Sequence, residues 1–144
     1  MAAVEATRTF PGSVADAEAR WYDTSRWSQW VDGLERVEAV DPAYPAAGAA
    51  VTWVSGPAGR GRVSERVIEH APGAGQTVDV QDGAITGRQI VAFATAGDAV
   101  SVTLALEYRL RRRSPVTLLL DVLFVRRAMA QSLERTLSRF VANA

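Results

Sequence analysis

The clearest pattern along the chain is an alternation of apolar and polar positions over residues 100–110. Successive side chains of a strand point to opposite faces, so this alternation predicts a strand that is buried on one side. Weaker alternation, interrupted by turn-forming pairs such as Asp82-Gly83, predicts further strands at 4–10, 35–40, 50–55, 61–68, 77–81 and 85–95. Because no helical spacing separates the last six strands, we expect an antiparallel meander. The apolar face of the last strand consists of Val100, Val102, Leu104, Leu106, Tyr108 and Leu110.

Helical spacing occurs in two places. Between the first two strands it predicts short helices at 14–23 and 26–31, and Ser13 stands as an N-cap with Asp16 three residues later. After the last strand, Pro115 occupies a position that the first turn of a helix tolerates, and the helical pattern continues to about Val141. At ~1.5 Å per residue, its apolar stripe from Leu118 to Phe140 is about 33 Å long, enough to cross a sheet.

These elements predict one α+β domain over residues 1–144, without a linker or an internal repeat. The expected architecture is a seven-stranded curved antiparallel sheet wrapped around the long C-terminal helix, with two short helices between strands 1 and 2. This is the helix-grip fold. One helix cannot fill the concavity of a curved sheet along its whole width, so side chains or a ligand must fill the remainder.

Three segments resemble the SRPBCC superfamily, which includes START lipid-transfer domains, birch-pollen-allergen-like proteins and polyketide cyclases/dehydrases. They are Asp23-Thr24-Ser25-Arg26-Trp27-Ser28-Gln29-Trp30, then Arg66-Val67-Ile68-Glu69-His70-Ala71-Pro72, and the closing helix over 128–141. The resemblance implies an internal cavity, reached between the long helix and neighbouring loops, that carries or reshapes hydrophobic molecules. It transfers no catalytic set, because one fold serves both carriers and enzymes.

Composition narrows the chemistry. The formal net charge is zero, which gives no long-range attraction to nucleic acid, and we expect none as a partner. All 16 basic residues are Arg, as in GC-rich bacterial genomes, and without Lys or Cys the chain has neither Schiff-base nor thiolate chemistry. We expect no metal and no cofactor: there is one His, and the glycines of residues 56–61 join two strands rather than a strand and a helix.

Aromatic and apolar side chains, with one amide and one guanidinium group, form the predicted ligand-binding set. Trp27, Trp30 and Trp53 offer flat apolar surfaces to an aromatic or polyketide-like ligand, and the alternative is that they only pack the short helices onto the sheet. The full set, including residues of the long helix, is Trp27, Trp30, Trp53, Arg88, Gln89, Tyr108, Val122, Val125, Met129 and Leu133.

The strand at 61–70 carries charge on both faces, so either face would bring an ionisable group towards the cavity. One hypothesis is that Glu65 or Arg66, with Arg88 or Gln89 nearby, orients a carbonyl or takes an enolic proton. The alternative is an edge strand wetted on both faces. His70 is either a general base or an exposed turn residue.

Three functions remain open on the sequence alone. The first is binding of a small hydrophobic molecule that is polyketide-, lipid- or aromatic-like. The second is an enzyme of polyketide cyclase, aromatase or dehydratase type. The third is a lipid or quinone chaperone that contacts a membrane through Arg109 and Arg111 to Arg113, for which a solvated loop is the alternative. We expect a cytoplasmic protein, since the N-terminal segment lacks the basic and apolar stretches of a secretory signal. We expect it to be a monomer or a homodimer.

Overall fold

The computed structural model describes residues 2–56, 61–111 and 118–144, and for 118–122 it describes the backbone alone. Its elements confirm the predicted helix-grip architecture, with a short 3-10 helix added before the second helix. In chain order they are β1 (Ala2–Pro11), α1 (Val14–Trp21), η1 (Thr24–Arg26), α2 (Trp27–Trp30), β2 (Leu34–Val40), β3 (Ala50–Ser55), β4 (Arg62–Ala71), β5 (Gly75–Gln81), β6 (Ile85–Ala96), β7 (Ala99–Leu110) and α3 (Leu118–Ala142).

The seven strands form one antiparallel sheet in the order β1-β7-β6-β5-β4-β3-β2. The chain meanders from β2 to β7, as predicted, and β1 pairs with β7, which leaves β1 and β2 as the two edges. The suggestion that strand 61–70 lies at an edge was wrong. β4 pairs with β3 on one side and with β5 on the other, so its side chains divide between an inner and an outer face.

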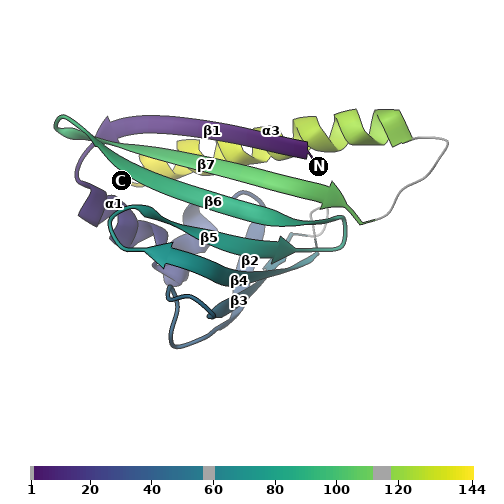
Figure 1. Cartoon of the computed structure of the whole chain (residues 1–144), viewed down its shortest axis with the longest axis horizontal. Coiled ribbons are helices and arrows are strands. Elements are labelled where there is room, and N and C mark those ends of the chain that lie inside the picture. The colour runs from purple at the N-terminus through teal and green to yellow at the C-terminus, as the bar shows by residue number, and fades with distance from the viewer. Residues whose placement is uncertain (1, 57–60, 112–117) are drawn as a thin grey trace.

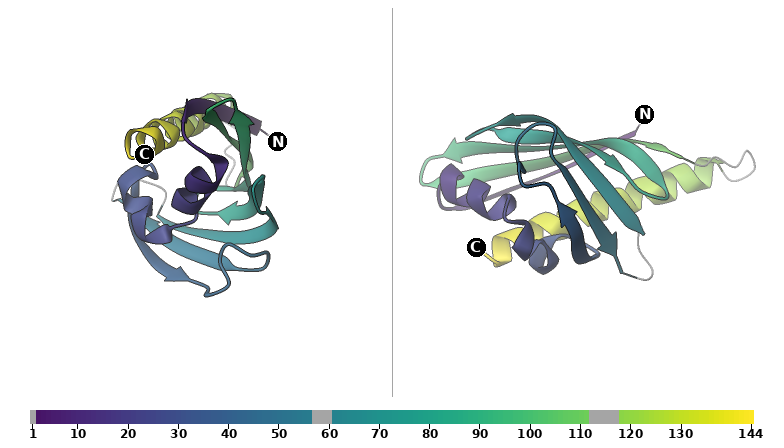
Figure 2. Two further views of the ribbon diagram at one scale, coloured as in Figure 1. Left: turned by 90° about the vertical axis from the view of Figure 1, so that its left-hand side faces the viewer. Right: turned by 90° about the horizontal axis from the view of Figure 1, so that it is seen from below.

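The helices close the open side of the curved sheet. α3 packs against β1 and β7, and also against α2, which in turn packs against β2. The two sheet edges are therefore connected through α3 and α2, as the end view in Figure 2 shows. Figure 1 shows α3 running alongside β1 and extending past the end of the sheet. The enclosed space lies between the inner face of the sheet and the C-terminal half of α3.

Local sequence explains how the short helices turn the chain inward. The hydroxyl of Ser13 accepts a hydrogen bond of 3.1 Å from the backbone N–H of Asp16, which caps α1 as predicted. After α1 ends, the Asp23 carboxylate accepts from the backbone N–H of Ser25 and starts η1. This tight turn brings Trp30 back onto Trp21, with ring centroids 4.6 Å apart.

The alternation of β7 is confirmed in full between Val100 and Tyr108, whose five apolar positions are buried. Gly87 on β6 pairs directly with Tyr108. A Cβ atom at Gly87 would lie 2.3 Å from the carbonyl oxygen of Glu107 and 2.9 Å from Cα of Tyr108. The missing side chain at Gly87 therefore allows the two strands to approach closely at this point.

Candidate functional site

A small pocket lies between α2, the inner face of β3 to β7 and the C-terminal half of α3. Its volume is about 40 Å³, enough for a few water molecules. All four tryptophans of the chain line it, together with Tyr44, so its walls are largely aromatic. The lining residues are Trp21, Trp27, Trp30, Val31, Asp32, Tyr44, Trp53, Glu65, Gln76, Gln89, Leu104, Ser132, Leu133 and Thr136.

Trp53 and Glu65 form the polar centre of this pocket. Both lie on the inner face of the sheet, Trp53 on β3 and Glu65 on β4, two residues beyond Val63, which pairs with Trp53. This diagonal arrangement brings long side chains within reach of each other. The indole Nε1 of Trp53 donates a hydrogen bond of 2.7 Å to Oε2 of Glu65. A carboxylate therefore sits among aromatic rings, held in place by one of them.

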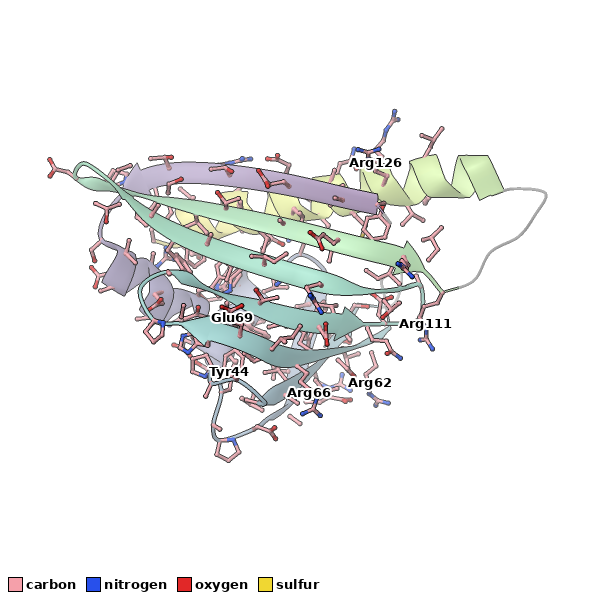
Figure 3. All side chains as sticks on the ribbon, viewed as in Figure 1. Tyr44, Arg62, Arg66, Glu69, Arg111 and Arg126 are labelled. Carbon is pink, nitrogen blue, oxygen red and sulfur yellow. The ribbon has the colours of Figure 1, made fainter. Side chains whose placement is uncertain are left out.

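The structure separates the two residues of the hypothesised catalytic pair. Arg66 is exposed on the outer face, where its Nη1 donates to the carbonyl of Gly48 at 3.0 Å, and Figure 3 labels it there. Arg88 is also outside, with its Nε 3.6 Å from Oδ1 of Asp79. Their neighbours Glu65 and Gln89 face inward and line the pocket. The alternation of the strands thus puts the carboxylate and the amide inside and both guanidinium groups outside.

Tyr44 is a pocket residue that the sequence did not suggest. It lies in the connection between β2 and β3, and its ring is 5.8 Å from that of Trp27 in an edge-to-face arrangement. Gln76 fixes this connection to β5 by donating to the carbonyl of Pro45 at 3.2 Å. Burial raises the pKa of Tyr44, and the negative charge of Glu65 raises it further, so the phenol stays neutral.

Asp32 joins α3 to the turn before β2 at one side of the pocket. Its two carboxylate oxygens accept hydrogen bonds of 3.0 and 3.1 Å from Arg135, and Arg139 adds a third at 3.1 Å. The backbone N–H of Asp32 donates to the hydroxyl of Thr136 at 3.0 Å. Burial alone would raise the pKa of Asp32, but hydrogen bonds from Arg135 and Ser132 and the two positive charges outweigh it and lower the pKa.

Of the remaining predicted ligand-binding residues, Leu133 belongs to the lining described above, and Val125, Met129 and Tyr108 do not. Val125 and Met129 instead pack against the hydrophobic core nearer the start of α3. Tyr108 is buried on β7, and within the described part of the chain its hydroxyl finds no hydrogen-bond partner. Burial raises the pKa of Tyr108, and the charge of Arg126 opposes this. The side chain of Val122 lies outside the description.

His70 was expected either as a base or in an exposed turn. A bulge between Val67 and Glu69 shifts the register of β4, so that His70 pairs with the buried Gln76 and stays within the strand. The imidazole is half-buried and packs edge-on against Tyr22, with ring centroids 5.1 Å apart. The exposed-turn expectation was therefore wrong, and His70 is not among the residues that line the pocket.

The basic run after β7 is only partly within the description. Arg111 donates from Nη1 to the carbonyl of Asp82 at 2.7 Å, which attaches this end of β7 to the turn before β6, while Arg109 is exposed. Arg112 and Arg113 fall outside the described residues.

Among 2–56, 61–111 and 118–144, no helix is long and apolar enough to cross a membrane, and no group of three His, Asp or Glu side chains is placed to hold a metal.

A curved antiparallel sheet closed by a C-terminal helix is the fold of START-like SRPBCC domains. The chain belongs to the polyketide cyclase / dehydrase and lipid transport family, whose model matches residues 1–144. No curated protein sequence matches it significantly.

Solved structures show the same fold. A protein from Thermus thermophilus superposes with a TM-score of 0.81 at 19% identity, over 98% of this chain and 95% of that one. A START superfamily protein from Mycobacterium smegmatis gives 0.77 at 13% identity, over 98% and 95%. The di-domain ARO/CYC protein StfQ from the steffimycin biosynthetic pathway gives 0.75 at 14% identity, over 97% of this chain and 50% of that one. Identities at this level show the shared fold alone.

Proposed function

We propose that the protein binds a small, flat, largely aromatic molecule in the pocket between the sheet and α3. The observation that carries this proposal is the convergence of all four tryptophans and Tyr44 on one pocket. Aromatic side chains supply rigid apolar surface, and a few polar groups such as those of Gln76 and Gln89 are suited to fix the orientation of a ligand. The family match and the likeness to a protein of the steffimycin biosynthetic pathway support the same ligand chemistry.

The size of the pocket sets a condition on binding. Pockets for drug-sized ligands measure roughly 300–1,000 Å³, whereas the volume described here is about 40 Å³. A ligand of two fused rings therefore requires α2 and α3 to move apart. The contacts between Asp32 and Arg135 lie across this boundary and would have to yield.

Tryptophan fluorescence tests the proposal directly, because every indole of the chain lines the pocket. We expect 2-naphthalenemethanol to quench the wild-type protein saturably. Ser132→Phe, which adds a ring at the pocket wall, should abolish saturable quenching. Ser138→Phe, at an exposed position of the same helix, should retain it. Equal binding by both variants, or non-saturable quenching of the wild type, would contradict the proposal that the ligand binds in this pocket.

A second candidate function is proton transfer of the polyketide cyclase type, favoured by the position of Glu65. Its carboxylate is suited to accept a proton from an enolisable substrate in the pocket, and Tyr44 remains a neutral phenol. On this proposal Glu65→Gln abolishes turnover of a poly-β-ketone substrate but retains binding of 2-naphthalenemethanol. Arg66→Gln, at the adjacent outward position, should keep full turnover; loss of activity in both variants would argue against a specific role for Glu65.

A third candidate, contact with a membrane, is favoured by the outer side of α3 near its start. Phe124 is 74% exposed and Leu123 is 56% exposed, and the exposed Arg126 and Arg127 follow them. Apolar side chains beside arginines suit an anionic lipid surface. We expect flotation with vesicles of phosphatidylserine and phosphatidylcholine at low salt, reduced by Phe124→Ser. If the wild-type protein does not float with the vesicles, the proposal of membrane contact is wrong.

A further inference from the structure

Gln89 differs from Gln76 and Thr136, which also line the pocket with neutral polar side chains. Gln76 donates to the carbonyl of Pro45 at 3.2 Å, and the hydroxyl of Thr136 accepts from the backbone N–H of Asp32 at 3.0 Å. In the part of the chain that the structure describes, the carboxamide of Gln89 has no hydrogen-bond partner. The amide of Gln89 is therefore available to a ligand, whereas Gln76 and Thr136 already hold parts of the protein together.

The neighbours of Gln89 on the inner face of the sheet explain why its amide is unpaired. Gln89 pairs with Val78 on β5 and with Leu106 on β7, and both of these residues are buried. Along β6 its neighbours on the same face are Gly87, which has no side chain, and the buried Val91. None of these four positions has a side chain that can donate or accept a hydrogen bond. A partner for the amide must therefore come from the space of the pocket.

On this basis we propose that Gln89 is a specificity-determining residue whose carboxamide binds an amide group of the ligand, so that the ligand class is a flat aromatic amide or lactam. This inference rests on the proposed binding function and specifies its ligand. The side chain of Gln89 offers N–H donors at Nε2 and an acceptor at Oε1, side by side. An amide with an N–H on the same side as its carbonyl presents the complementary pair, so two hydrogen bonds form together.

Groups of similar shape satisfy the Gln89 amide less completely. A methyl ketone accepts one hydrogen bond from Nε2 but leaves Oε1 without a donor. A carboxylate, which is ionised at neutral pH, also has no donor and places a second acceptor against Oε1. A polar atom that is desolvated by the ligand but left unpaired carries a free-energy penalty, so a site built on hydrogen bonds rejects analogues that lack them. The pocket should therefore distinguish ligands by their polar edge as well as by their shape.

The experiment compares 2-naphthamide with 2-acetonaphthone, in which a methyl group replaces the NH2 group, in fluorescence titrations of the wild-type protein. We expect the amide to bind roughly tenfold more tightly than the ketone, and Gln89→Leu should reduce this ratio to less than about twofold. Gln81→Leu, at an exposed position of β5, is the matched control and should leave the ratio unchanged. The ratio reports the polar contact itself, because a change that only loosened the pocket would weaken both probes alike.

The outcomes separate this inference from the proposed function. Equal affinities of the two probes for the wild type, or a ratio that Gln89→Leu does not change, would overturn the inference while the pocket stands. If neither probe binds but 2-naphthalenemethanol does, the amide inference alone fails. If none of the three compounds binds, the proposed function fails with it.

Should Gln89→Leu not fold, the side-chain NH2 protons of Gln89 in the wild-type protein provide a second test by nuclear magnetic resonance. We expect saturating 2-naphthamide to shift one of these protons downfield, because it becomes hydrogen-bonded to the ligand carbonyl. The side-chain NH2 protons of the exposed Gln81 are the internal control and should not shift. An unshifted Gln89 signal would overturn the inference.

Discussion

The indole Nε1 of Trp53 donates a hydrogen bond of 2.7 Å to Oε2 of Glu65, and this contact links β3 to β4 inside the pocket. Hydrogen bonds to charged groups contribute more than neutral ones, because a buried carboxylate that loses a donor bears part of the desolvation penalty. The contact thus serves both the stability of the sheet and the position of the carboxylate.

Trp53→Phe removes this donor while keeping an aromatic ring. We expect the free energy of unfolding in urea to fall by about 1–3 kcal/mol. Trp27→Phe is the matched control, because the indole of Trp27 donates to a neutral acceptor, the carbonyl of Trp21, at 2.8 Å, and its loss should cost less. In the double variant Trp53→Phe/Glu65→Gln the two losses should be less than additive. Strict additivity would show that the contact contributes nothing by itself.

Asp32→Asn tests the connection between α3 and the turn before β2. The folded-state pKa of Asp32 lies below its ordinary value, so its contribution to stability is present above about pH 4 and is lost as the pH falls through the folded pKa. The variant should be less stable than the wild type by about 1 kcal/mol at neutral pH, and the difference should shrink below about pH 4. Urea unfolding across this pH range measures it, and a difference that does not change with pH would contradict the assignment.

The same variant should admit ligand faster, since the contacts of Asp32 with Arg135 lie across the boundary that must open. Stopped-flow fluorescence with 2-naphthalenemethanol measures this association rate. Asp79→Asn, which removes an exposed ion pair with Arg88 on the outer face, is the control and should change neither stability nor rate appreciably. An unchanged rate for Asp32→Asn would show that ligand enters elsewhere.

Gly87→Ala tests the close approach of β6 and β7. The added Cβ would meet backbone atoms of Glu107 and Tyr108, which cannot yield without displacing the strand. We expect a loss of roughly 2–4 kcal/mol in the free energy of unfolding. Gly56→Ala adds a methyl group where nothing lies within 4 Å, and it should be nearly neutral. A well-folded Gly87→Ala protein of wild-type stability would show that the strands separate easily.

The sequence predicted the sheet and its covering helix because hydrophobic periodicity is a local signal. It left the direction of Glu65 open, since the strand at 61–70 carries charge on both faces. The structure answers that question through register: Glu65 pairs with Val51 and lies two residues from Val63, and both valines are buried on the inner face. The bulge after Val67 then changes the phase of the strand, which is why His70 does not follow the simple alternation.

Tyr44 shows a different limit. It stands between Pro42 and Pro45 in a connection whose composition predicts only a loop. Its burial depends on a long-range contact, the hydrogen bond from Gln76 to the carbonyl of Pro45, and on packing against Trp27. Periodicity carries no information about how a loop folds back over a sheet. An aromatic residue within a turn-forming loop was the one available signal.

The two sides of α3 should respond very differently to truncation. Leu137 is 0% exposed and Leu123 is 56% exposed, although both are leucines of the same helix. Leu137→Ala leaves a cavity in the core and should lower the free energy of unfolding by about 2–5 kcal/mol. Leu123→Ala should change it by less than about 0.5 kcal/mol, as surface substitutions usually do. Because the two variants carry the same chemical change, urea unfolding of both measures the difference between the buried and exposed sides. A large loss of stability in Leu123→Ala would mean that this side of α3 is covered in solution. The proposed membrane contact would then be wrong, because it requires this side to be exposed.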